Sequence, residues 1–183
     1  MPGNSAEFIG DIPTHYDTGL GPNIFVDFAD RLTAAACAGK ATKVIELAAG
    51  TGIVSRKLRD GLPPETPLLV TDLNSPMLEV AKGKFVAGEN VDFAVANAME
   101  LAFEDAAFDL MVCQFGVMFC PDKPASFREA ARVLGPGGRY VFNVFSAMEK
   151  NPYSQIAYGV PARFFPDDRP GFYKAPFHYG DPE

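Results

Sequence analysis

Cysteine, histidine and basic residues are scarce in this sequence, and each shortage argues against a class of protein. Three cysteines without a Cys-x-x-Cys pair and two histidines do not suit a disulfide framework or a structural zinc site. With 16 Lys and Arg against 23 Asp and Glu, the net charge of −7 does not suit a nucleic-acid-binding protein, which needs a cationic face. Apolar runs also stay shorter than the roughly 18 residues of a membrane-spanning helix.

The remaining composition is that of an ordinary globular domain. Of the 183 residues, 48% are hydrophobic and 21% are charged, which is enough apolar material for a core without covalent cross-links. The amino-terminal sequence lacks the basic region and apolar stretch of a signal peptide. We therefore expect a soluble, reduced protein in the cytoplasm.

Short apolar runs alternate along the chain with segments of helical periodicity. Strands are predicted at 44–47, 68–71, 91–95, 108–113 and 139–145, and helices at about 23–37, 52–60, 75–85 and 121–134. This alternation predicts an α/β fold, a Rossmann-like doubly wound and mostly parallel sheet with helices on both faces. We expect the strand order 3-2-1-4-5 and a ligand site at the carboxyl ends of the strands.

Three segments can be distinguished by composition. Residues 1–40 read as an arm and a helix over the site, with Asn23 as the cap of that helix. Residues 41–146 form the predicted core. Residues 147–183 are rich in proline and aromatic residues without a clear period, so an irregular cap is predicted there.

A ligand loop is predicted directly after the first strand. Residues 44–52 read Val-Ile-Glu-Leu-Ala-Ala-Gly-Thr-Gly, so the carboxylate of Glu46 is followed by small residues. Small residues let a ligand approach the backbone, and glycine tolerates positive φ. A tight turn that binds nothing would also use these glycines, but a carboxylate in such a position needs a partner.

A second carboxylate, Asp72, ends the next strand about 20 residues after Gly52. An acid there can accept hydrogen bonds from ribose hydroxyls, and the alternative role of helix cap is one that Asn74 already offers. Dinucleotide loops read Gly-x-Gly-x-x-Gly and bind a pyrophosphate. Here Ala48 takes the first glycine position, and Glu46 precedes it. The carboxylate of Glu46 would repel a pyrophosphate but attract an ammonium or a sulfonium.

With these motifs the sequence resembles the class I S-adenosylmethionine-dependent methyltransferases, in the branch of the ubiquinone/menaquinone-type enzymes. The resemblance covers about residues 8–183. It rests on five motifs in the family's order, which are residues 46–52, the stretch from Asp72 to Met77, and residues 96–103, 108–116 and 134–138.

The resemblance implies S-adenosyl-L-methionine as the cofactor and no metal. The residues implied to bind it are Tyr16, Glu46, Ala48, Gly50, Gly52, Asp72, Leu73, Met77, Asn97, Ala98, Met99, Gln114 and Phe115. Asn97 stands where the family usually has an Asp. Its uncharged amide oxygen would accept the hydrogen bond from the adenine amino group in place of a carboxylate. Ala48 replaces a glycine, which is tolerable if its φ is negative. Tyr16 lies in an arm that covers the cofactor in related enzymes.

The implied reaction is methyl transfer to an O, N or C nucleophile of a small-molecule acceptor. The sequence identifies no catalytic base, since His15 and His178 are the only histidines and neither is in a motif. A nicotinamide-dependent oxidoreductase and a non-catalytic cofactor-binding module remain as alternatives. We expect acceptor specificity to reside in residues 1–22 and 146–183, which would cover the site.

The family's sheet continues beyond five strands, whereas this sequence stops at residues that read as a helix start. We therefore expect the chain to be incomplete at its carboxyl end, with residues 139–145 as an exposed sheet edge. Such an edge is covered either by the chain's own residues after 150 or by a second copy, which would make a homodimer.

Overall fold

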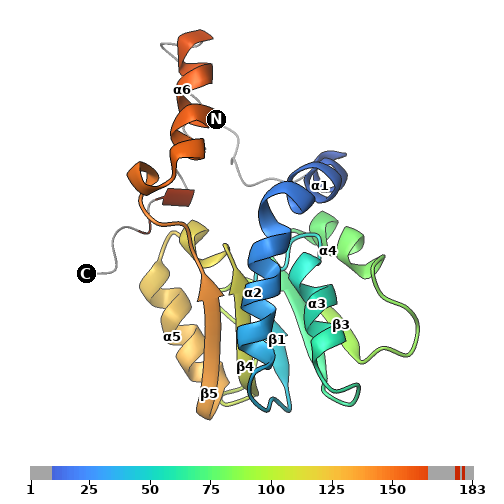
Figure 1. The fold of residues 1–183 in the computed structure, drawn as a ribbon. Coiled ribbons are helices and arrows are strands. Elements are labelled where there is room, and N and C mark those ends of the chain that lie inside the picture. The colour runs from blue at the N-terminus through green and yellow to red at the C-terminus, as the bar shows by residue number, and fades with distance from the viewer. Residues whose placement is uncertain (1–9, 165–175, 178, 180–183) are drawn as a thin grey trace.

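A five-stranded parallel sheet forms the centre of the computed structural model, which describes residues 10–164, 176, 177 and 179 (Figure 1). The strands are β1 (Val44–Glu46), β2 (Leu68–Asp72), β3 (Val91–Val95), β4 (Phe108–Gln114) and β5 (Leu134–Asn143). Their order is β3-β2-β1-β4-β5, and every neighbouring pair is parallel. The fold class and the strand order predicted from the sequence are confirmed.

Alternation along the strands produces two apolar layers, one on each face of the sheet. Val44 of β1 packs with Val70 and Val112 in one cluster, whereas Ile45 packs with Met111 in the other. Because side chains alternate across a strand, Glu46 shares the face of Val44. Each of these fully buried aliphatic side chains contributes about 1.5–3 kcal/mol through burial.

Helices cover both faces, as the alternation predicts. The helices α2 (Val26–Cys37), α3 (Ile53–Gly61) and α4 (Ser75–Lys82) contribute Leu32, Leu58 and Leu78 to the first cluster. The helix α5 (Lys123–Val133) contributes Ala130 and Val133 to the second. The side chain of Asp122 caps α5 by accepting a bond from the amide of Ala125 at 2.8 Å.

The amino-terminal arm is helical well before the predicted start at Asn23. A short helix α1 (Ile12–His15) runs into a π-helix η1 (Tyr16–Phe25), which continues into α2. Asn23 is therefore not a cap, and its side-chain amide donates to the carbonyl of Gly19 at 2.7 Å. Pro22 has no N–H and would displace a carbonyl of a preceding α-turn, which fits the departure from α geometry here.

The segment after β5 also differs from the prediction. A 3₁₀ turn η3 (Met148–Lys150) leads into a helix α6 (Pro152–Phe164) where an irregular cap was expected. Proline at the first helical position suits a helix start, and the Asn151 side chain holds the entry by donating to the carbonyls of Ser146 and Ala147 at 2.9 Å. The rest of the expected cap, including His178, lies outside the described residues.

Both α1 and α6 lie beyond the end of the sheet toward which the strand arrows point (Figure 1). Within the described residues β5 has a single strand neighbour, β4. None of the described helices is long and apolar enough to cross a membrane.

Candidate functional site

The loops that leave β1, β2 and β4 meet at the carboxyl end of the sheet. β1 pairs with both β2 and β4, so the residues that follow these three strands are neighbours in space. This is the edge at which parallel α/β sheets bind ligands. The sequence placed most of its candidate residues in these loops.

The loop after β1 has three residues in the left-handed region. Ala48 has a φ of 50°, Gly50 of 58° and Gly52 of 82°. The expectation that Ala48 is tolerated through a negative φ is therefore wrong. The loop keeps the left-handed geometry with a Cβ in place, at a cost of about 1–2 kcal/mol.

Close packing around this loop explains two glycines, one within it and one after β4. A Cβ at Gly52 would lie 2.8 Å from the Cβ of Ala81 on α4. Gly116, after β4, is constrained in the same way, because its Cβ would lie 2.4 Å from the Cβ of Ala48. The backbone of the loop is further fixed by a bond from the amide of Ala49 to the carbonyl of Thr71 at 2.9 Å.

The carboxylate of Asp72 joins two of the loops. Its Oδ2 accepts from the backbone amide of Gly50 at 2.8 Å, and its Oδ1 accepts from the amide and the side chain of Asn74 at 2.8 and 3.3 Å. The Asn74 side chain is thus turned toward Asp72 and makes no cap bond to α4, although Asn74 occupies the cap position. A carboxylate has about four acceptor positions, so Asp72 retains capacity for a further donor.

Glu46, the last residue of β1, is a buried carboxylate. It is 1% exposed, and its Oε2 has no hydrogen-bond partner among the described residues. Burial raises its pKa to about 8, the charge of Asp72 adds to the rise, and the Ser55 hydroxyl opposes it.

Two further buried polar atoms at these strand ends lack a partner in the described part of the chain. They are the hydroxyl of Thr51, in the loop after β1, and the Oε1 of Gln114, at the end of β4. An unsatisfied buried polar group costs about 1–3 kcal/mol, so several at one place indicate a site built for a polar ligand. Thr51 and Ser55 were not among the sequence-predicted residues, although both lie within or just after the Gly-x-Gly loop.

The amino-terminal arm lies over these loops. Tyr16 stacks on Phe25 with ring centroids 5.3 Å apart. Burial raises the pKa of Tyr16, and the charge of Asp72 adds to this effect. At the other end of η1, the amide of Gln114 donates to the carbonyl of Phe25 at 3.2 Å.

The remaining predicted residues differ in burial and in their contacts with the loops. Met77 is buried, with its Cε 4.0 Å from the position of a Cβ on Gly50, whereas Leu73 is 63% exposed. The Oδ1 of Asn97 accepts from the amide of Met99 at 3.0 Å and so holds a turn. Ala98, in the same turn, is half-buried.

Phe115 belongs to an aromatic cluster beside the loops. Its ring stacks on Phe145 with centroids 4.2 Å apart and planes 9° apart, and Phe28 and Phe25 approach at 5.1 and 5.9 Å. This aromatic cluster, defined by Phe25, Phe28, Phe115 and Phe145, connects the arm and α2 with the ends of β4 and β5. Phe145 and Phe25 carried no local signal in the sequence, because their contacts are long-range.

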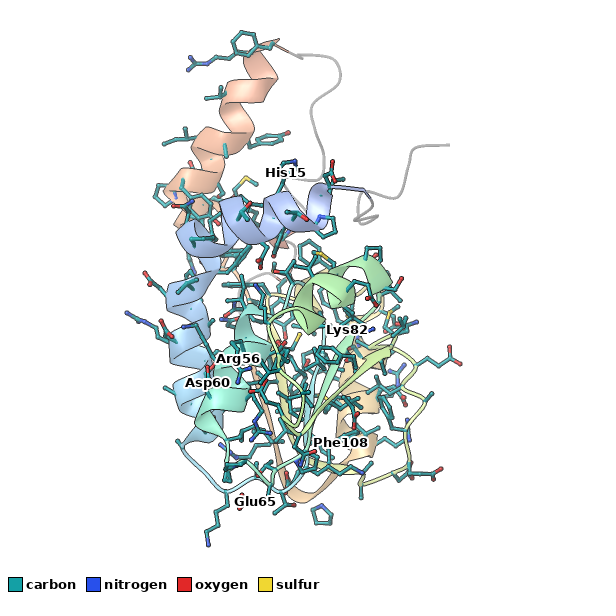
Figure 2. The ribbon with its side chains drawn as sticks, turned by 90° about the vertical axis from the view of Figure 1, so that its right-hand side faces the viewer. His15, Arg56, Asp60, Glu65, Lys82 and Phe108 are labelled. Atoms are coloured by element: carbon teal, nitrogen blue, oxygen red, sulfur yellow. The ribbon has the colours of Figure 1, made fainter. Side chains whose placement is uncertain are left out.

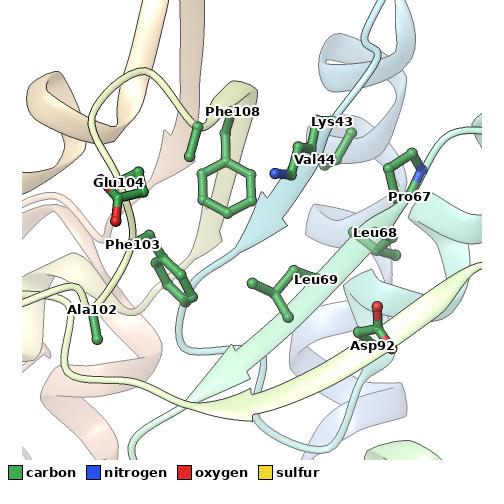
Figure 3. A pocket seen from close by; sticks show the side chains of 11 residues that line it. Lys43, Val44, Pro67, Leu68, Leu69, Asp92, Ala102, Phe103, Glu104 and Phe108 are labelled. Atoms are coloured by element: carbon green, nitrogen blue, oxygen red, sulfur yellow. The ribbon is translucent and has the colours of Figure 1, made fainter.

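His15, one of the two histidines considered as a base, is exposed on α1 and points away from the sheet (Figure 2). A cavity of about 480 Å³ lies at the opposite end of the sheet, where Leu69, Phe103 and Phe108 point into it (Figure 3). That cavity borders the amino ends of β2 and β4 and none of the loops described above.

Comparison with known proteins agrees with this geometry. A solved structure from Methanococcus maripaludis superposes with a TM-score of 0.65 at 21% identity, over 91% of this chain and 77% of that chain. An arsenic(III) S-adenosylmethionine methyltransferase from Chlamydomonas reinhardtii superposes with a TM-score of 0.53 at 24% identity, over 61% of this chain and 48% of that chain. The fold is thus the Rossmann-like fold of methyltransferases.

Sequence comparison identifies the family. The profile of the ubiE/COQ5 methyltransferase family matches residues 23–166, and the chain belongs to this family. The ubiquinone/menaquinone biosynthesis C-methyltransferase UbiE of Hahella chejuensis is 36% identical over 120 residues, 64% of this chain and 48% of that protein. A demethylmenaquinone methyltransferase of Staphylococcus aureus is 38% identical over 102 residues, 56% of this chain and 42% of that protein. The matched region thus spans about half of the length of these relatives.

Proposed function

We propose that this chain binds S-adenosyl-L-methionine at the carboxyl ends of β1, β2 and β4 and serves methyl transfer to a small-molecule acceptor. The observation that carries the proposal is the buried, unpartnered carboxylate oxygen of Glu46 beside a left-handed loop. A buried carboxylate needs a donor or a cation, and the cofactor offers an ammonium and a sulfonium. Membership of the ubiE/COQ5 methyltransferase family supports the same cofactor.

The polar groups of the site fit the parts of this cofactor. Glu46 suits the ammonium, and the hydroxyls of Thr51 and Ser55 suit the amino-acid carboxylate as donors. Asp72 retains acceptor capacity for ribose hydroxyls. Leu73 is exposed at the same edge and is available to pack against the adenine.

The cofactor supplies a methyl group on a positively charged sulfur, which is already activated for transfer. What this chain's own residues contribute is binding, orientation and exclusion of water. Asp72 fixes the loop through Gly50, and the arm with Tyr16 covers it. No base is assigned, because His15 points away from the sheet and His178 lies outside the described residues.

We further propose a quinone-type acceptor, methylated on carbon. The support is the names of the relatives, which refer to ubiquinone and menaquinone biosynthesis, together with the aromatic cluster beside the loops. Flat aromatic surfaces suit a flat ring. The division of the chain at residues 40 and 146, the cytoplasmic location and the homodimer stay predictions.

The family match does not favour a nicotinamide-dependent oxidoreductase. Whether the chain is an enzyme or a non-catalytic binding module is decided by measuring binding and methyl transfer separately. Titration calorimetry of the chain with S-adenosylhomocysteine should show binding, with NAD as the control ligand that does not bind. Transfer of a labelled methyl group to a demethylmenaquinol analogue should then follow. Binding of NAD instead of S-adenosylhomocysteine would refute the proposal, and binding without transfer would favour the module.

A further inference from the structure

An ion pair joins the amino-terminal arm to the segment after α4. The Nζ of Lys84 donates to both carboxylate oxygens of Asp17, at 2.8 and 2.7 Å. The side chains are 26% and 21% exposed, so the pair is largely shielded from water. Exposed ion pairs contribute little, but shielding and a two-oxygen geometry strengthen the interaction.

The two partners come from well-separated parts of the chain, and the backbone of Lys84 has a further contact of its own. Asp17 is the second residue of η1, and Lys84 lies two residues beyond α4. The carbonyl of Lys84 accepts from the guanidinium of Arg56 at 3.2 Å, and Arg56 itself pairs with Glu89 at 2.6 Å. The backbone of Lys84 is thus bound to α3, the helix that carries Arg56.

The Asp17–Lys84 ion pair lies at the end of η1 that carries Tyr16. Asp17 directly follows Tyr16, whose ring stacks on Phe25 at 5.3 Å, and Phe25 in turn packs on Phe115, which follows β4. The far end of η1 is held separately, by the bond from Gln114 to Phe25 and by the packing of Gly21 on Ile53, where a Cβ would approach to 2.8 Å. The ion pair is therefore a polar tether at the end of η1 that carries Tyr16.

We propose that Asp17 and Lys84 are positioning residues that hold Tyr16 and η1 closed over the carboxyl ends of β1 and β2 and so slow the release of the bound cofactor. This proposal rests on the proposed function, because it assigns the covered site to S-adenosyl-L-methionine. Asp17 and Lys84 act through the arm and do not themselves contact the cofactor. Their effect is on how long the arm stays closed, so it belongs to dissociation more than to the chemical step.

The test compares three variants of the chain with a matched control. Asp17→Asn and Lys84→Met remove one charge each, and the exchanged pair Asp17→Lys with Lys84→Asp restores an ion pair of opposite polarity. Lys82→Met is the control, because the Nζ of Lys82 forms an exposed pair with Glu79 at 2.7 Å within α4 and lies over the ring of Phe93 on β3. Two quantities are measured, the dissociation rate of S-adenosylhomocysteine and the hydrogen exchange of the amides of residues 16–25 without ligand.

Each single variant should raise the dissociation rate by about two- to tenfold, and the exchanged pair should recover part of the loss. The arm amides should exchange faster in the single variants, because the arm opens more often when the ion pair is absent. The control should match the wild type in both measurements.

The two proposals fail in different ways. If the wild type binds S-adenosylhomocysteine and both single variants release it at the wild-type rate, the positioning role is wrong while the proposed function stands. If the wild type does not bind it, the proposed function is wrong, and the exchange experiment alone decides the tether. Unchanged hydrogen exchange of residues 16–25 in both single variants would then overturn the proposed role of the Asp17–Lys84 pair.

Discussion

The Oδ2 of Asp72 accepts a hydrogen bond from the backbone amide of Gly50 at 2.8 Å, across two loops that follow different strands. The sequence predicts Asp72 as a ligand residue, and the structure adds that the same carboxylate fixes the loop over which the ligand would lie. Binding and loop order are therefore coupled in one side chain. A carboxylate at 7% exposure with these partners is held in place before any ligand arrives.

Replacement of Asp72 by Ala should affect both roles. We expect the dissociation constant of S-adenosylhomocysteine to rise by about tenfold to a hundredfold, because charge-assisted bonds contribute about 1.5–3 kcal/mol. The free energy of unfolding should fall by about 1–3 kcal/mol, because the amides of Gly50 and Asn74 lose their acceptor. Calorimetry and urea denaturation measure the two effects. Asp92→Ala, at an exposed position of β3, is the control and should change neither, and unchanged affinity in Asp72→Ala would contradict the assignment.

The close contact between Ala48 and Gly116 leads to a second prediction, which concerns the free energy of unfolding. Gly116→Ala should lower the free energy of unfolding by about 1–3 kcal/mol, because its Cβ would lie 2.4 Å from that of Ala48 and 2.7 Å from the Sγ of Cys113. Adding Ala48→Gly should recover part of this loss. By itself, Ala48→Gly should be neutral or stabilising by up to about 1 kcal/mol, because the left-handed φ no longer strains a Cβ.

Ala34→Gly is the control for this pair, since Ala34 is exposed in the middle of α2. There the same replacement should cost about 0.5–1 kcal/mol. If Ala48→Gly were as costly as Ala34→Gly in urea denaturation, the strain assigned to the loop would be absent.

The sequence predicts those parts of the fold that are encoded by local pattern. The strands and their order followed from apolar runs separated by helical periods, and Glu46, Gly50 and Asp72 followed from the positions of acids and glycines at strand ends. The φ of Ala48 was mispredicted because residue type alone suggests a negative value. It is instead imposed by the neighbouring chain at Thr71 and Gly116.

Helices were missed where the composition argues against them. Pro13, Pro22 and several glycines suggested an irregular arm, yet Pro13 lies in the first turn of α1 and Pro22 is accommodated by the π-helix η1. The pair of Asp17 and Lys84 could not be predicted, because a contact across 67 residues leaves no local signal.

The aromatic cluster makes a prediction that separates acceptor binding from cofactor binding. Phe145→Ala removes the ring that stacks on Phe115 and should raise the KM for a quinol acceptor by about tenfold, the scale of one lost aromatic contact. The affinity for S-adenosylhomocysteine should stay within about twofold, because Phe145 lies beyond the loops that carry Glu46 and Asp72. Methyl-transfer kinetics and calorimetry measure the two values. Exposed Phe119→Ala is the matched control, and an equal rise of KM in both variants would contradict an acceptor role for the cluster.

The last prediction concerns the pH dependence of stability through Glu46. Burial raises its pKa from 4.5 to about 8, so between these values the folded chain holds a proton that the unfolded chain has lost. Stability falls with rising pH wherever the folded state binds more protons, so the contribution of Glu46 is fully present below about pH 4.5 and is lost as the pH rises through 8.

The Glu46→Gln variant keeps the shape of the side chain and cannot titrate. Relative to the wild type, its free energy of unfolding should show a flatter pH dependence between pH 5 and 8, with a difference in slope of up to about 1.4 kcal/mol per pH unit. Urea denaturation at several pH values measures this difference. Parallel profiles for the two proteins would mean that Glu46 is already charged in the folded state, and hence that it has found a cation or donor without any ligand.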